Sequence, residues 1–283
     1  MGYGDDLLIT KLASKIKKKY PDRQIIIGSS NKKTASHSII FDNNPNIADC
    51  RNLKKNIPIH LINYNPSNRP YIDYIKSTNT KYVWKKFKPE PGQIFFSQKE
   101  KLDAKKIISQ AIDYWKKKSA KRYKKIIFIE TSSTKIHDNQ FGIKQQNKDW
   151  GYDNWEKLIE IINQDYLLIH SVHGESKKLP DIFTPPNMNF RLACAVLNES
   201  DFYVGPEGGF GHAAAALNKK AVLYFGGWIS PEVIGYDFHE NVYYENKLSP
   251  CGEYKNLCTH CEKARKKISV EVFLKHIDKV ASN

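Results

Sequence analysis

Several features that would assign this chain to a class of protein are missing from its sequence. No apolar run approaches the roughly 18 residues needed to cross a bilayer, and no apolar segment follows Met1 as a secretory signal would require. Only 2 of the 283 residues are Met, and 5 Cys are too few for a disulfide framework in a chain of this length. These absences predict a soluble protein of the cytoplasm.

The chain does have the apolar and aromatic material that a folded core needs. Hydrophobic residues make up 40% of it, and the 16 Tyr, 13 Phe and 5 Trp exceed what disordered chains carry. A chain of 283 residues is long enough for one large domain or two of ordinary size.

Acidic residues are scarce relative to basic ones. Lys and Arg total 45 against 30 Asp and Glu, which gives a formal net charge of +15. This excess favours a polyanionic partner, such as nucleic acid, an anionic membrane surface or a phosphorylated substrate. The basic residues occur in short runs at 17–19, 116–118 and 265–267, without a single dense patch. Solvated helix faces therefore explain the charge as well, and both interpretations stay open.

The order of the apolar segments predicts an α/β fold. In the first half we expect a helix over 7–20, strands over 24–27, 38–41 and 57–62, weaker strands over 71–75, 82–84 and 94–96, a helix over 98–118 and a linker over 119–124. In the second half we expect strands over 125–130, 167–171, 202–205 and 221–225, and helices over 154–164, 190–198 and 211–217. Strands that alternate with helices indicate a mostly parallel sheet. We expect two α/β domains, residues 1–120 and 121–283, facing each other across a cleft.

Two glycine-containing segments carry the candidate chemistry. Residues 2–6 read Gly-Tyr-Gly-Asp-Asp just before the first predicted helix, where Asp5 can face a ligand or can simply cap the helix. Later, a strand ends in a turn with Gly208 and Gly209 and opens a helix of small residues, an arrangement that suits phosphate. Glu207 and His212 project at this turn, where a sugar or ribose can lie. The alternative is a tight connection with a capping Glu and a core His.

Thr131 and Ser132 follow the strand that closes with Glu130. At the carboxyl end of that strand their hydroxyls can contribute donors to the same crevice, or they can be ordinary loop residues.

Three of the cysteines cluster late in the chain, at Cys251, Cys258 and Cys261. Their spacing has the atoms for zinc, and Cys-x2-Cys is ordinary zinc-ligand spacing. His260 is adjacent to Cys261 and does not easily reach the same ion, so a distant fourth ligand such as His239 is required. Buried thiols or a local structural cross-link are the alternatives.

These segments together resemble glycosyltransferase family 9, the heptosyltransferase-like group. The resemblance covers most of the chain and is best over 145–240. It is carried by residues 2–10, 205–217 and 220–227, with further agreement at 43–47, at 147–150 before Trp155, and at Gly235-Tyr236 with His239 downstream.

The resemblance implies a GT-B architecture of two Rossmann-like domains, with the acceptor on the N-terminal domain and the sugar nucleotide on the C-terminal one. It also implies inverting transfer without a metal. Asp5 then matches the general base, Lys148 matches a lysine that meets the donor phosphates, and Gly208, Gly209 and His212 match the donor turn. Two features depart from the family: Glu207 stands where the family usually has Asp, and only Met1 precedes Gly2 where the family has a strand.

The function that follows is a glycosyltransferase of the hexosyl or heptosyl class that uses an ADP-heptose-like or other nucleotide sugar and needs no other cofactor. The resemblance suggests lipopolysaccharide or another cell-surface glycan as acceptor, and the positive charge suits a phosphorylated glycolipid at the inner membrane surface. One alternative is transfer to modified nucleic acid bases. Another is a binding module for nucleotide sugars or glycans without catalysis. We expect the three cysteines to order their segment and not to act in transfer.

Overall fold

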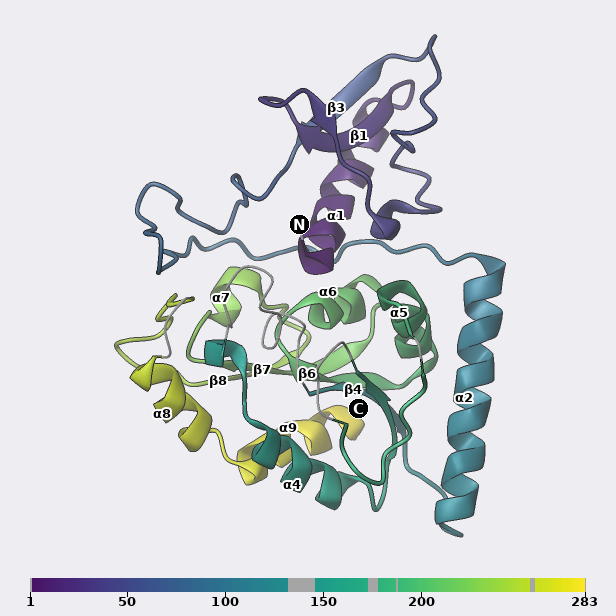
Figure 1. Cartoon of the computed structure of the whole chain (residues 1–283), viewed down its shortest axis with the longest axis vertical. Helices are drawn as coiled ribbons and strands as arrows, with labels where there is room; N and C mark the ends of the chain where they lie inside the picture. The colour runs from purple at the N-terminus through teal and green to yellow at the C-terminus, as the bar shows by residue number, and fades with distance from the viewer. Residues whose placement is uncertain (1, 132–145, 173–177, 187, 255–257, 283) are drawn as a thin grey trace.

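The computed structural model in Figure 1 describes residues 2–131, 146–172, 178–186, 188–254 and 258–282, which form two separate sheets. The first sheet is small. In it, β1 (Gln24–Ser29) pairs in parallel with β3 (Ile59–Asn63) and antiparallel with β2 (Thr34–Ala35). The helix α1 (Tyr3–Lys19) descends from this sheet, and its N-terminus points toward the second sheet (Figure 1).

The second sheet has five parallel strands in the order β5-β4-β6-β7-β8. The strands are β4 (Ile126–Glu130), β5 (Leu167–Ser171), β6 (Phe202–Pro206), β7 (Lys220–Gly226) and β8 (Glu240–Tyr243). Every residue of β4, β5 and β6 is buried, as expected when helices cover both faces of a parallel sheet. The predicted α/β class and parallel sheet are confirmed.

Helices lie on both faces of this second sheet (Figure 1). The helices α5 and α6 cover the face that is turned toward α1, whereas α4 and α9 cover the opposite face. The helices are α4 (Tyr152–Ile162), α5 (Phe190–Glu199), α6 (Gly209–Ala216), α7 (Pro231–Ile234), α8 (Thr259–Lys267) and α9 (Val270–Ala281). The side chains of β4 alternate between the two cores: Phe128 packs with Phe210 of α6, whereas Ile127 belongs to the core with Trp155 and Phe273. No described helix is long and apolar enough to cross a membrane.

The long helix α2 (Gln98–Lys118) has the bounds that the sequence predicts, because its ends are encoded locally. Ser97 and Glu100 form a capping box, in which the Ser97 hydroxyl accepts from the Glu100 amide and the Glu100 carboxylate accepts from the Ser97 amide. A run of three lysines occupies its last turn, where cations are favourable. The helix packs along α5 of the later half (Figure 1), and the domain boundary near residue 120 stays a prediction.

Four of the predicted strands in the first half are wrong. Residues 38–41 form the 3-10 helix η1 (Ile39–Phe41), because the Ser38 hydroxyl accepts a hydrogen bond from the Ile40 amide and turns the chain. The segments 71–75 and 82–84 meet only in an isolated bridge between Ile72 and Trp84, and 94–96 is extended without a strand partner in this fully described stretch. Their aromatic side chains pack on one another and on other loops: Tyr71 stacks on Trp84, and Trp84 packs edge-on against Trp228.

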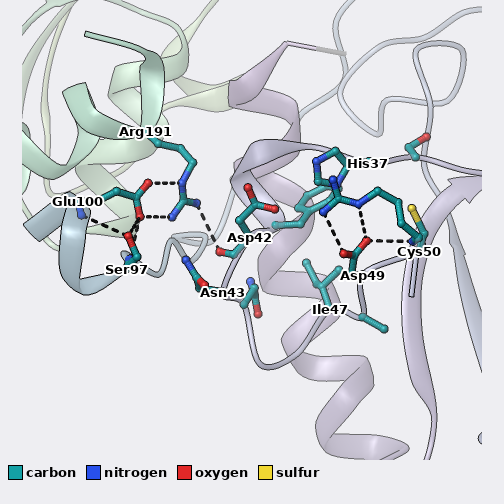
Figure 2. A pocket seen from close by; sticks show the side chains of 14 residues that line it. His37, Asp42, Asn43, Ile47, Asp49, Cys50, Ser97, Glu100 and Arg191 are labelled. Atoms are coloured by element: carbon teal, nitrogen blue, oxygen red, sulfur yellow. Dashed lines mark hydrogen bonds and ion pairs between the residues drawn. The ribbon is translucent and has the colours of Figure 1, made fainter. Parts of the chain in front are cut away.

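A buried guanidinium joins the two halves of the molecule. Arg191, near the start of α5, is 5% exposed, and Figure 2 shows it between Glu100 and the loop of Asp42. Its Nε and Nη2 atoms bind the Glu100 carboxylate at 2.6 and 2.9 Å, and its other contacts are to the carbonyls of Ile39, Asp42 and Phe95. A pocket of about 620 Å³ lies beside this cluster. The position of η1 relative to α5 therefore depends on Arg191.

We predict that Arg191→Met lowers the free energy of unfolding by about 3–5 kcal/mol, because it leaves the Glu100 carboxylate without its partner and removes donors from three carbonyls. Urea denaturation of both proteins measures the difference. Arg51→Met is the matched control, because Arg51 makes a similar pair with Asp49 at the surface, with 61% of the Arg51 side chain exposed. The control is expected to cost less than about 1 kcal/mol. Equal small losses for both variants would contradict the assignment.

Candidate active site

The strand order places a topological switch point at the carboxyl ends of β4 and β6. β4 lies between β5 and β6, so the connections that follow β4 and β6 run to opposite sides of this point, where sheets of this kind bind their ligands. Thr131 follows β4, and Glu207 and Gly208 follow β6. The structure thus brings these sequence-predicted residues to one edge. Thr131 is buried and its hydroxyl lies 3.2 Å from His170 Nε2, whereas Ser132 lies outside the described residues.

The glycine turn leaves the start of α6 open. Gly208 has a φ of +155°, and a Cβ there would meet nothing within 4 Å. No side chain caps α6, so the amide groups of its first turn are not satisfied by a capping group. A turn of this form can receive an anion, as the sequence predicts.

The start of α1 packs directly on this turn. A Cβ on Gly4 would lie 2.8 Å from His212 Cδ2 and 3.4 Å from the Gly209 Cα, so only glycine allows the two helix ends to approach this closely. Next to it, Tyr3 stacks on Phe190 with ring centroids 4.7 Å apart. The two glycine segments, far apart in the sequence, therefore form one site (Figure 1).

Asp5 lies in this site with its carboxylate surrounded by donors. Its Oδ2 is 3.0 Å from Arg69 Nε, and its Oδ1 accepts from the hydroxyls of Tyr71 at 2.5 Å and Tyr64 at 3.4 Å. Burial, and after it the Asp5 charge, raises the pKa of Tyr71 well above its ordinary value, so this phenol remains a donor. The sequence did not identify Arg69, Tyr71 and Tyr64 as residues of this site. They follow β3 and reach Asp5 only through the tertiary fold.

Asp6 has a different role from Asp5. Its Oδ2 accepts from the Ser38 hydroxyl at 2.7 Å, beside η1, and burial raises the pKa of this carboxyl. Gly2 is the N-cap residue of α1, and no side chain caps that helix. The alternative in which Asp5 caps this helix is therefore wrong, and Asp6 does not cap it either.

Lys148 and Glu207 meet on the other side of the glycine turn. Lys148 ends the short 3-10 helix η2 (Gln146–Lys148), its ammonium pairs with Glu207 Oε1, and it lies 4.8 Å from the centroid of the Trp228 ring. The Lys148 and Glu207 side chains are only 9% and 4% exposed. Since both charges are held away from water, each depends on the other as its partner.

His212 connects the two sides of the site. Its Nδ1 lies 2.9 Å from the Tyr236 hydroxyl, and its side chain touches the position of Gly4. Burial lowers the pKa of His212 to about 4, against opposing effects of the Glu207 and Asp5 charges. The ring is therefore neutral at physiological pH and acts through hydrogen bonding and packing.

Cys251, Cys258 and Cys261 also come together, with their sulfur atoms within 4.8 Å of one another. All three are free thiols, so the interpretation as a cross-link is wrong. His239 as a fourth ligand is also wrong, because its Nε2 lies 3.2 Å from the Lys219 carbonyl, in another part of the fold. His260 points to Ser249 at 2.6 Å. Within the described ranges, only the three thiols share this position.

The thiol cluster suits a thiophilic metal, and it braces the candidate site. A hydrogen bond with Cys261 lowers the pKa of Cys251 to about 7, which favours the thiolate that metals bind. The Cys251 amide donates to the Gly227 carbonyl at 3.0 Å, so the cluster holds the loop that carries Trp228.

Known structures identify the fold. The glycosyltransferase family 9 protein from Veillonella parvula DSM 2008 superposes with a TM-score of 0.58 at 12% identity, covering 99% of this chain and 94% of that one. The chain has the fold of family 9 glycosyltransferases. A second structure, the iron-containing dodecameric glycosyltransferase TibC from enterotoxigenic E. coli H10407, superposes with a TM-score of 0.59 at 14% identity, covering 99% of this chain and 74% of TibC. No protein-family model and no curated protein matches the sequence.

These likenesses confirm the GT-B class and the family resemblance at the level of the fold. They leave the roles of Asp5, Lys148 and the glycine turn as predictions.

Proposed function

We propose that this protein is a glycosyltransferase that moves a sugar from a nucleoside-diphosphate donor to a hydroxyl group, with inversion and without a catalytic metal. The contact between the start of α1 and the glycine turn of α6 carries this proposal. It sets a carboxylate, Asp5, beside a set of anion-binding amides. Single displacement at an anomeric carbon needs a proton acceptor on one side and stabilisation of the leaving group on the other.

Asp5 serves as the base. A carboxylate offers about four acceptor positions; the two phenols use those of Oδ1, and Arg69 forms an ion pair with Oδ2. A free acceptor position on Oδ2 receives the proton of the acceptor hydroxyl. The acceptor oxygen then bonds to the anomeric carbon as the bond from that carbon to the diphosphate oxygen breaks.

Lys148 and the first amides of α6 meet the charge that develops on the diphosphate. One ammonium and a row of fixed N–H groups supply this without a metal. When the diphosphate binds, the Lys148 ammonium turns from Glu207 to the phosphate oxygens. The Glu207 carboxylate is then available to accept hydrogen bonds from sugar hydroxyls, which makes it a determinant of the donor sugar.

The acceptor is a lipopolysaccharide or other cell-surface glycan in this proposal, and the net charge of +15 suits a phosphorylated glycolipid at the inner membrane surface. The same charge also favours nucleic acid as acceptor. A steep fall of affinity for random duplex DNA with rising salt would support that second candidate.

Asp5→Asn is predicted to reduce kcat by roughly 10²- to 10⁴-fold while the KM for the donor changes little, because the amide keeps the size of the side chain but does not accept a proton. Steady-state kinetics with a panel of nucleotide sugars that includes ADP-heptose measures this. Asp6→Asn is the control and should retain turnover, since Asp6 binds Ser38 beside η1. Full activity in Asp5→Asn with loss in Asp6→Asn would reverse the assignment. Donor binding without any turnover in the wild type would favour a binding module.

We predict that Lys148→Ala lowers kcat/KM, with a loss of about 2–4 kcal/mol of transition-state stabilisation, because one donor to the leaving group is removed. The same donor panel, in the presence of chelator, gives the measurement. Lys124→Ala is the matched control, because Lys124 also pairs with a carboxylate, that of Asp165. This pair lies at the amino ends of β4 and β5, whereas the candidate site lies at the carboxyl ends of the strands. If Lys148→Ala works at the wild-type rate and affinity, the diphosphate binds elsewhere.

Removal of bound metal is predicted to leave the transfer rate intact, because the three thiols brace a loop and none is placed as a reacting group. Elemental analysis before and after chelation reports any metal, and initial rates report activity. Activity that disappears with chelation and returns with added zinc or iron would contradict metal-independent transfer.

A further inference from the structure

Trp228 places an unused hydrogen-bond donor in the candidate site. The residue follows β7, at the same edge of the sheet as Glu207, whose amide donates to the Tyr224 carbonyl of β7 at 2.9 Å. Its side chain is 5% exposed, and the indole Nε1 has no hydrogen-bond acceptor among the residues that the structure describes. Burying an N–H group without a partner is destabilising, so a native protein that retains one usually has a use for it.

The surroundings fix this indole firmly. Trp84 packs edge-on against its ring, with centroids 5.0 Å apart, and the Trp84 indole donates to the Trp228 carbonyl at 3.2 Å. The Gly252 amide donates to the same carbonyl at 3.1 Å. The backbone carbonyl and the ring of Trp228 are thus both held in place. A side chain that is already fixed in this way loses little conformational entropy when it binds a ligand.

The charge beside the indole indicates what the ligand is. The Lys148 ammonium lies 4.8 Å from the Trp228 ring centroid, and its own partner is the Glu207 carboxylate. A ligand that recruits both the ammonium and the indole N–H must present anionic oxygens. Phosphate oxygens accept from N–H groups and from lysine.

We infer that the indole N–H of Trp228 donates a hydrogen bond to the diphosphate of the nucleotide donor and so makes Trp228 a binding residue for the β-phosphate. This inference rests on the proposed function. The indole nitrogen is closed to solvent, so the diphosphate reaches it only when neighbouring groups move, and the Lys148 ammonium over the ring is the group that the proposed function moves. A nucleoside monophosphate has no β-phosphate to accept this hydrogen bond, so the N–H increases the affinity for diphosphates alone.

Trp228→Phe tests this, because it keeps an aromatic ring for Lys148 and Trp84 but removes the N–H. The probes are ADP, GDP and UDP with the corresponding monophosphates, titrated by calorimetry. For the diphosphate that the wild type binds, we expect a Kd about 10- to 100-fold higher in Trp228→Phe, and an unchanged Kd for its monophosphate. Trp115→Phe is the matched control and should leave both affinities unchanged, since Trp115 lies in α2, outside the candidate site, and its indole N–H already donates to the Lys121 carbonyl at 2.6 Å.

A second measurement does not depend on the variant folding. The chain has 5 Trp, so the wild-type protein gives few indole N–H signals by NMR, and the Trp228 signal is assigned through its bonds to the backbone in the isotope-labelled wild type. We expect that signal to shift on addition of the diphosphate and to stay in place with the monophosphate. An unchanged diphosphate affinity, an equal loss for the monophosphate, or a shift only with an intact nucleotide sugar would overturn the inference. A wild type that binds no nucleotide would instead overturn the proposed function.

Discussion

The close contact between Gly4 of α1 and the start of α6 is the constraint on which the site depends. Any side chain at position 4 would collide with His212, so the two helix ends can meet only through glycine. That contact determines where Asp5 lies relative to the Gly208-Gly209 turn. It also brings the start of α1 to the carboxyl ends of strands that lie far later in the sequence.

The charges of the candidate site are compensated in pairs by other residues of the protein. Asp5 is held by Arg69, and Lys148 is held by Glu207 and lies over the Trp228 ring. Burying these groups without partners would be costly, so the pairs keep the ligand-free fold stable. In the proposed reaction the diphosphate takes the place of Glu207 beside Lys148, and sugar hydroxyls donate hydrogen bonds to the Glu207 carboxylate.

The two halves are held in register by contacts away from this site. Arg191 binds a carboxylate and three carbonyls beside a pocket of about 620 Å³ (Figure 2), and Trp84 packs on Trp228 near the thiol cluster. Both contacts join the first 100 residues to the chain after residue 190. The geometry of the candidate site therefore depends on residues outside it, and in the proposed reaction small displacements of the reacting groups would lower the rate.

The sequence by itself determined the elements whose signals are local. The capping box of Ser97 and Glu100 marks the start of α2, and the strand, glycine turn and helix at 202–217 have the periodicity and small residues that define a βα unit. The segment 38–41 was misread as a strand because an apolar run is ambiguous until a neighbour pairs with it. Only the tertiary structure decided that Arg69 and Tyr71 surround Asp5 and that Trp228 lies beneath Lys148. Such contacts join side chains from segments far apart in the sequence. The residues that make them follow no regular spacing along the chain, so no sequence pattern predicts that they meet.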